Sequence, residues 1–348
     1  MKIRIGKKMV GPGERCFVIA EIGVNHNGST ITAKELIDKA FKAGVDAVKF
    51  QTFSADRLVT KDAPQAKYQN ENTKRRLTQY QLLKQLELKQ TDYRELKAYC
   101  LQLGILFLSS PFDELAVDLL DDLGVEAFKI PSGEITNLPF LDYVARKKKP
   151  IILSTGMAFL NEVEVAVKVI ENAGGKEIIL LQCTSAYPAK PEDINLRAMD
   201  TLRSAFNYPV GFSDHTLGCE IALASVAMGA DLVEKHFTLD KSMEGPDHKA
   251  SIDPKELEYL VKSIRKIEAA FGDGKKIPTN NEDEIAKLVR KSIYANKDIT
   301  ANEEISRDKL KISRPGDGLP PSSLDLILGK KAKEDIKAGT QITLEQIK

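Results

Sequence analysis

Lysine and hydroxyl side chains interrupt or follow several short apolar stretches of this 348-residue sequence. Lys49 and Lys129 lie inside such stretches, and burying an ammonium group is costly unless an anion lies nearby. Hydroxyl groups follow other stretches at Ser109, Ser110, Ser132, Ser154, Thr155 and Ser213. Two buried lysines with a set of hydroxyls favour a small polyanionic ligand that carries phosphate or carboxylate groups. The alternatives are helix N-caps for the single serines and unrelated salt bridges for the lysines.

Two of the four histidines, His215 and His236, also follow apolar stretches. Two imidazoles at one rim are suited to a divalent transition metal with water or substrate in the open positions. The alternative is that each histidine only makes hydrogen bonds, which is the commoner role of a lone histidine. His26, in Asn-His-Asn-Gly, and His248, after Gly-Pro-Asp, are interpreted as turn and loop residues. The residues alone therefore predict a metal-assisted enzyme that acts on a small anion.

Eight apolar stretches must position these side chains, and most are separated by about 20 to 30 residues, the size of a strand with its crossover helix. Amphipathic helices are predicted between them, for example over 31–43, 162–172 and 218–228. An unbroken alternation of strand and helix favours a closed parallel (β/α)₈ barrel, the TIM barrel. Polar residues at the C-terminal ends of its strands converge on one catalytic face. The predicted strands are 17–20, 47–50, 105–108, 127–130, 151–153, 178–181, 210–212 and 232–233.

The chain is predicted to hold two domains, a barrel over residues 1–272 and a small β-rich domain over 286–348. A polar linker without apolar periodicity is predicted between them, over 273–285. Strand-like segments in the small domain are 291–295, 309–313 and 339–344. Within the barrel, the polar stretch 56–79 is predicted to be an inserted loop on the rim, and long loops in compact domains are often functional.

Composition narrows the class of protein. Lys and Arg number 51 against 50 Asp and Glu, so the net charge of +1 excludes the basic surface of a dedicated nucleic-acid binder. No apolar run reaches the roughly 20 residues that span a bilayer, and the first residues do not resemble a secretory leader. The four cysteines form no C-x-x-C pair, which predicts free thiols. We expect a cytoplasmic protein with no nucleic-acid or membrane partner.

The motifs taken together resemble the sialic acid synthase family, whose members condense phosphoenolpyruvate with an N-acylated hexosamine. The resemblance covers nearly the whole chain, and SRPGDG lies in what resembles the family's antifreeze-like (SAF) domain. It rests on AEIGVNHNG (20–28), VKFQTF (48–53), SSPFD (109–113), KIPSGE (129–134), ILSTGM (152–157), CTSAYP (183–188), GFSDHT (211–216), EKHFTLDKSMEGPDHKAS (234–251) and SRPGDG (313–318).

This resemblance implies roles for the matched residues. The carboxylate and phosphate of phosphoenolpyruvate would be held by Lys49, Lys129, Ser132, Ser154 and Ser213, with Ser110 standing where many relatives have threonine. Mn²⁺ would bind His215 and His236, with Mg²⁺ or Co²⁺ as alternatives. The residues that would contact the sugar or position the attacking water are Glu21, Gln51, Glu134, Tyr187 and Asp247. Glu134, Glu21 and Lys129 are the expected catalytic residues.

The resemblance also implies a partner subunit. In the family, the residue matched by Arg314 reaches the N-acyl group of the sugar from the other subunit, so we expect a domain-swapped homodimer. Gln182 and Ser185 stand where some relatives have other residues, which leaves the contacts of the sixth strand open. Asp317 replaces a frequent asparagine in the C-terminal signature.

The expected reaction is that of an N-acetylneuraminate synthase acting on N-acetylmannosamine. The alternative is an N,N'-diacetyllegionaminate synthase acting on 2,4-diacetamido-2,4,6-trideoxymannose. KIPSGE and GPDHKAS resemble both of these branches and not the pseudaminate branch. A metal-dependent barrel lyase or isomerase is a further alternative. A non-catalytic carbohydrate-binding protein is disfavoured because every expected polar position is filled.

Overall fold

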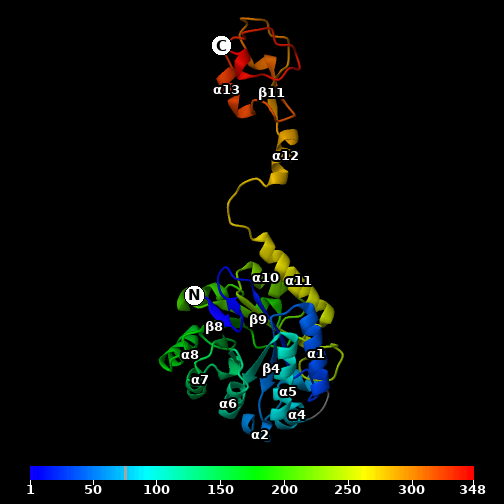
Figure 1. The fold of residues 1–348 in the computed structure, drawn as a ribbon, viewed down its shortest axis with the longest axis vertical. Coiled ribbons are helices and arrows are strands. Elements are labelled where there is room, and N and C mark those ends of the chain that lie inside the picture. Colours follow the sequence, from blue (N-terminus) through cyan, green and yellow to red (C-terminus); the bar gives the residue numbers. More distant parts are fainter. Residues whose placement is uncertain (74–76) are drawn as a thin grey trace. The chain divides into compact units, whose positions relative to one another are not determined.

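The structure is a computed structural model that describes residues 1–73 and 77–348. The chain divides into two compact units, Met1–Phe271 and Gly272–Lys348. In the first unit, strands form an inner layer and helices surround them (Figure 1).

The inner layer of the first unit is a sheet of eight parallel strands in the order β5-β4-β3-β10-β9-β8-β7-β6. Each predicted stretch overlaps one of them, which confirms the predicted barrel. The sheet is a nearly closed barrel, with β5 and β6 at the two ends of the hydrogen-bonded order. The strands are β3 (Phe17–Gly23), β4 (Ala47–Thr52), β5 (Leu106–Pro111), β6 (Phe128–Ile130), β7 (Ile151–Ser154), β8 (Ile178–Cys183), β9 (Val210–Asp214) and β10 (Leu232–His236).

The outer layer consists of amphipathic helices, and α1 (Thr30–Ala43) shows why they form. The Ser29 hydroxyl accepts a hydrogen bond from the Thr32 amide, and Gly44 ends the helix with a φ of 83° that favours glycine. Its buried face packs against the barrel through Ala33, Leu36, Ile37 and Ala40. The other outer helices are α5 (Gln90–Leu103), α6 (Glu114–Asp122), α7 (Leu138–Ala145), α8 (Leu160–Asn172), α9 (Ala198–Phe206), α10 (Glu220–Ala227) and α11 (Pro254–Ala270).

A short antiparallel hairpin, β1 (Ile3–Ile5) and β2 (Lys8–Val10), joins the core at the N-terminal ends of the barrel strands. Its side chains Ile3, Ile5 and Val10 are buried in one cluster with inward residues of the strands such as Phe17 and Leu232. The hairpin was not predicted, because strands of three residues are too short to show a periodic pattern.

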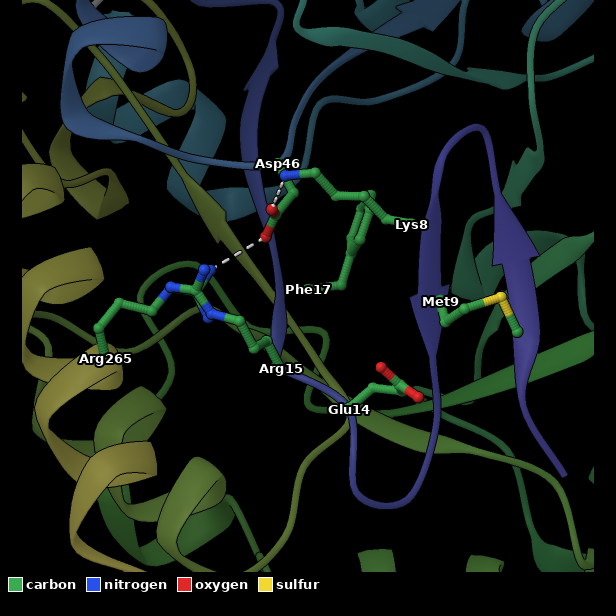
Figure 2. A pocket seen from close by; sticks show the side chains of 7 residues that line it. All are labelled: Lys8, Met9, Glu14, Arg15, Phe17, Asp46 and Arg265. Atoms are coloured by element: carbon green, nitrogen blue, oxygen red, sulfur yellow. Dashed lines mark hydrogen bonds and ion pairs between the residues drawn. The ribbon is translucent and has the colours of Figure 1, made fainter.

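Asp46 connects this hairpin to the barrel and to α11. Its carboxylate pairs with Lys8, accepts a hydrogen bond from the Val18 amide at 2.7 Å, and pairs with Arg265 at 3.2 Å. Figure 2 shows Lys8 and Arg265 converging on Asp46 beside a pocket that Phe17 also lines. A carboxylate shared by three elements fixes their relative positions at the end of the barrel away from the predicted site.

The predicted rim loop, 56–79, contains helical segments. Helix α2 (Ala55–Leu58) covers its first residues, α3 (Lys67–Thr73) lies inside it, and α4 (Gln79–Leu86) begins at its last residue with a capping box at Thr78. Residues 74–76 of this loop lie outside the described residues. Buried apolar side chains of this region, among them Phe53, Leu82 and Leu86, form a small cluster of their own.

The second unit has its own apolar core around an antiparallel pair of strands, β11 (Ser292–Ala295) and β12 (Leu310–Ser313). A short helix, α13 (Leu324–Ile327), adds Ile327 to this core. The predicted strand at 339–344 is instead an irregular segment with a single bridge between Gln341 and Tyr294. The predicted linker 273–285 runs into helix α12 (Asn280–Val289), whose first half is polar and whose apolar residues Ile285, Leu288 and Val289 are all exposed.

Among the described residues, no helix combines the length and apolar character needed to cross a bilayer. All four cysteines are buried free thiols, as predicted.

Candidate active site

Side chains alternate between the two faces of each barrel strand. This alternation brings charged side chains together at the C-terminal ends of the strands. Register pairs Glu21 of β3 with Lys49 of β4 and with His236 of β10, and it pairs Glu234 of β10 with Ser213 of β9. All five side chains are buried. Residues paired across neighbouring strands lie on the same face of the sheet, so these five line one end of the barrel.

Lys49 is the centre of a buried network of ion pairs. Its Nζ lies 2.7 Å from Oε2 of Glu21 and 3.7 Å from Oε1 of Glu234, and it donates to the Ser110 hydroxyl at 3.1 Å. Lys129 lies 3.7 Å from the same Glu234 oxygen. The structure thus brings together both predicted lysines, Glu21 and Ser110.

Glu234 is a site residue that the sequence analysis missed. Its Oε1 faces both lysines and accepts a hydrogen bond from Ser213 at 3.2 Å, while its Oε2 is buried without a partner among the described residues. The signal was available, since a strand that turns His236 inward must also turn Glu234, two residues earlier, inward.

Burial and neighbouring charges set the proton affinities in this network. Burial raises the pKa of Glu21 to about 7, against the opposing effect of Lys49. Burial would also raise the pKa of Glu234, but Lys129 and Lys49 outweigh it, so the pKa is lowered. Burial lowers the pKa of Lys129, with Glu234 opposing. Glu21 is therefore the member of this network that can take up a proton near neutral pH.

Two predicted serines lie beside the network with different partners. Ser132 accepts a hydrogen bond from the Gly156 amide at 3.0 Å and donates to Sγ of Cys183 at 3.6 Å. The buried Ser154 hydroxyl has no partner among the described residues, so it is available to a ligand. A side chain at Gly156 would come within 2.7 Å of the Ser132 hydroxyl, which explains the glycine at this point.

The two predicted metal ligands lie close together, with ring centroids 5.3 Å apart. Nδ1 of His215 is 2.7 Å from the carbonyl oxygen of Thr184. A carbonyl only accepts, so this nitrogen carries the hydrogen, and in the neutral ring Nε2 keeps its lone pair. Nδ1 of His236 is buried and has no partner among the residues that the structure describes.

The electrostatics of the two rings differ. Burial, assisted by His215 and nearby lysines, holds the pKa of His236 well below its usual range, so this ring is neutral. Burial also acts to lower the pKa of His215, but Cys183 and the Thr184 carbonyl outweigh it and raise the pKa. Within the described part of the chain no cluster of three or more His, Cys, Asp or Glu residues forms. The donor set fits a metal held by two imidazoles with the remaining positions open, and the metal itself stays a prediction.

Aromatic rings cover the histidines on one side. Tyr187 lies 4.2 Å from the His215 ring and meets His236 edge-on at 5.6 Å. Tyr68 of α3 stacks on Tyr187 with a centroid distance of 5.2 Å. Asp247 is buried nearby, and burial raises its pKa to about 6 while His215 opposes the shift. Tyr187 therefore lies beside the two histidines, and Tyr68 was missed because it lies in the polar loop.

Three further predicted residues lie in different surroundings. Gln51 donates to Oε1 of Glu21 at 3.4 Å, which joins it to the lysine network. Glu134 is half-buried after β6 and accepts a hydrogen bond from Asn137 at 2.7 Å. Arg314 is exposed directly after β12 in the second unit.

The other polar residues of the rim hold loops in place. His26 accepts a hydrogen bond from the Gly28 amide, and His248 contacts Thr238 at 2.7 Å and Asn27 at 3.2 Å. Gln182 donates to the Ile194 carbonyl. These contacts agree with the interpretation of both histidines as turn and loop residues.

Comparison with known proteins shows which family the chain belongs to. The model of the NeuB family matches residues 36–276, and that of the SAF domain matches residues 290–348. N,N'-diacetyllegionaminic acid synthase of Legionella pneumophila is 48% identical over 346 residues, covering 98% of this chain and 97% of its own. The protein of the same name from Campylobacter jejuni is 47% identical over 326 residues, covering 93% and 98%.

A solved structure agrees with this assignment. N-acetylneuraminic acid (sialic acid) synthetase of Leptospira borgpetersenii, crystallised in complex with citrate, matches with a TM-score of 0.73 at 35% identity. The match covers 82% of this chain and 95% of that chain. The chain therefore belongs to the NeuB family of sialic acid synthase-type enzymes and carries a SAF domain.

Proposed function

We propose that this enzyme is an N,N'-diacetyllegionaminate synthase. It would condense phosphoenolpyruvate with 2,4-diacetamido-2,4,6-trideoxymannose and water, releasing phosphate. The observation that carries the proposal is identity of 48% and 47% to two proteins of that name over nearly the whole chain, against 35% to the sialic acid synthetase of known structure. The sequence analysis placed N-acetylneuraminate synthase first, and the comparisons favour its alternative instead.

Phosphoenolpyruvate would bind at the lysine network. In the ligand-free site, Lys49 and Lys129 are neutralised by Glu21 and Glu234. A phosphate and a carboxylate compete for the same ammonium groups, and a proton taken up by Glu21 would remove one competing charge. The unpartnered Ser154 hydroxyl would supply a further hydrogen bond.

The sugar would bind between this network and the aromatic residues, near His215 and His236. A divalent ion held by the two histidines, Mn²⁺ first and Mg²⁺ or Co²⁺ as alternatives, would supply Lewis acidity at the aldehyde oxygen of the open-chain sugar. Tyr187 would flank the chain of the sugar, and Asp247 would bond its hydroxyl or amide groups. Glu21 and Gln51 would position the reacting end.

The bond changes then follow from this placement. C3 of phosphoenolpyruvate attacks the aldehyde carbon, which forms the new C–C bond and leaves an oxocarbenium-like C2. Water adds at C2, with Glu134 orienting it or taking its proton. The resulting tetrahedral intermediate expels phosphate with cleavage of the C2–O bond. Lys49 and Lys129 hold the departing phosphate, a contribution of position and charge.

A second subunit would complete the site through Arg314. The side chain is exposed, and the loop behind it is held in place by hydrogen bonds from Gly316 to Lys287 and from Gly318 to Ser292. On the barrel, Met157 and Phe159, which follow β7, are 72% and 76% exposed. Exposed apolar side chains beside a site favour a protein partner, and a homodimer is the partner that the family resemblance implies.

The test is phosphate release from phosphoenolpyruvate with Mn²⁺ and each sugar offered separately. We expect clear turnover with 2,4-diacetamido-2,4,6-trideoxymannose and at least tenfold lower kcat/KM with N-acetylmannosamine. The opposite preference would make the enzyme an N-acetylneuraminate synthase. Absence of phosphate release with either sugar would remove the condensation from consideration.

A further inference from the structure

Helix α3 (Lys67–Thr73) of the rim loop lies against the part of the site assigned to the sugar. Tyr68 stacks on Tyr187 with an angle of 24° between the rings, and Tyr187 lies against His215. Asn72, one turn later, donates to the Pro246 carbonyl at 2.7 Å, directly before Asp247. Burial raises the pKa of the Tyr68 hydroxyl, and the Asp247 carboxylate adds to the shift.

Gln65, three residues before Tyr68, has a side chain without hydrogen-bond partners among the described residues. It is 8% exposed, and neither its Oε1 nor its Nε2 makes a hydrogen bond within residues 1–73 and 77–348. Buried amide groups are nearly always satisfied, because leaving a donor and an acceptor unpaired away from water costs free energy. Hydrogen bonds from the Gln69 and Asn70 amides to the Ala66 carbonyl begin the helix immediately after Gln65 and fix it close to Tyr68.

An orphan carboxamide can pair with a second amide, for example by donating to its carbonyl oxygen. The two candidate sugars differ in this respect. At C4 the diacetamido sugar carries an acetamido group and N-acetylmannosamine carries a hydroxyl, while at C6 the first has a methyl group and the second a hydroxymethyl group. Only the first sugar presents an N–H and a C=O at the end remote from the aldehyde, with an apolar methyl group beside them.

We propose that Gln65 and Tyr68 are the residues that select the sugar. The Gln65 carboxamide donates through Nε2 to the carbonyl of the 4-acetamido group, and the Tyr68 ring covers the C6 methyl group. This inference rests on the proposed function and goes beyond it, since it assigns substrate choice to two residues of the rim loop. It also gives a physical reason for the unpaired amide, which the bound sugar would satisfy.

The experiment compares Gln65→Leu with the wild-type enzyme on both sugars. We expect kcat/KM for the diacetamido sugar to fall about tenfold, as for one lost hydrogen bond, with KM for phosphoenolpyruvate and kcat/KM for N-acetylmannosamine changed less than about threefold. Tyr68→Ala should lower kcat/KM for the 6-deoxy sugar about tenfold, and Tyr68→Phe should keep it. Gln102→Leu, on the exposed face of α5, is the matched control and should change nothing.

The thermal stability of the ligand-free enzyme distinguishes a role of Gln65 in binding the sugar from a role in stabilising the fold. Leucine removes the unpaired polar atoms, so the Tm of ligand-free Gln65→Leu should equal or exceed that of the wild type. A lowered Tm, or an equal loss of kcat/KM on both sugars, would overturn the inference while leaving the proposed function standing. A wild-type enzyme that turns over only N-acetylmannosamine would overturn both.

Discussion

Lys235 and Asp214 form an ion pair between β10 and β9, with 2.7 Å from Nζ to Oδ2, and neither side chain is exposed. Lys235 also donates to the Thr216 carbonyl, and Asp214 accepts hydrogen bonds from the amide and the hydroxyl of Thr216 at 2.9 and 2.8 Å. The pair lies on the opposite face of the strands from Ser213 and Glu234. It therefore fixes the backbone on both sides of His215 without entering the site.

Removing one partner of this ion pair should lower the free energy of unfolding far more than replacing both partners. Lys235→Met leaves a buried carboxylate unpaired, which should lower the free energy of unfolding by about 3 to 5 kcal/mol, whereas Lys235→Met with Asp214→Leu should recover most of that loss. Urea unfolding of the two single variants and the double variant measures the coupling. Strictly additive losses would show that the pair is not coupled.

The metal assignment predicts that His236→Ala loses metal-dependent turnover while the fold stays intact. The variant removes one of only two imidazoles, so the affinity for Mn²⁺ should fall more than about a hundredfold. Calorimetric titration of Mn²⁺ checks the binding, and circular dichroism checks the fold. Full activity in this variant would contradict a role for His236 as a ligand.

Glu21 should make stability depend on pH. Its pKa is raised from 4.5 to about 7 in the folded state, so between these values the folded protein binds more protons and loses stability as the pH rises. Relative to Glu21→Gln, which cannot ionise, the wild-type free energy of unfolding should fall by roughly 2 kcal/mol between pH 5 and pH 8. Chemical unfolding at a series of pH values measures the difference. A difference that stays constant over this range would show that Glu21 titrates normally.

If Arg314 is supplied by a partner subunit, two impaired variants should complement each other. Arg314→Ala should raise KM for the sugar and leave KM for phosphoenolpyruvate unchanged, so it has little activity at a low concentration of the sugar. In a refolded equal mixture with His236→Ala, half the dimers are mixed and each has one intact site, so about a quarter of the wild-type activity should return at that concentration. If Arg314 served the barrel of its own chain, no intact site would form and this activity would not return.

The sequence by itself determined the barrel and most of the rim. Apolar stretches at regular intervals, with helical periodicity between them, predicted eight parallel units, and the structure has all eight. Lys49, Lys129 and His236 could be placed because a charged or polar side chain in an apolar strand is costly to bury unless it meets a partner or a ligand. Features without a periodic signal were missed, such as the three-residue strands of the N-terminal hairpin.

Only the tertiary structure decided which of these residues are partners. Sequence order separates Glu234 from Lys49 and Lys129, and their meeting depends on the register of strands that close around the barrel. The same closure places Tyr68, in a polar loop with no pattern of its own, on the Tyr187 ring. Periodicity is a local property that a sequence displays directly, whereas ion pairing and ring stacking across the barrel depend on distances set by the packing of the whole unit.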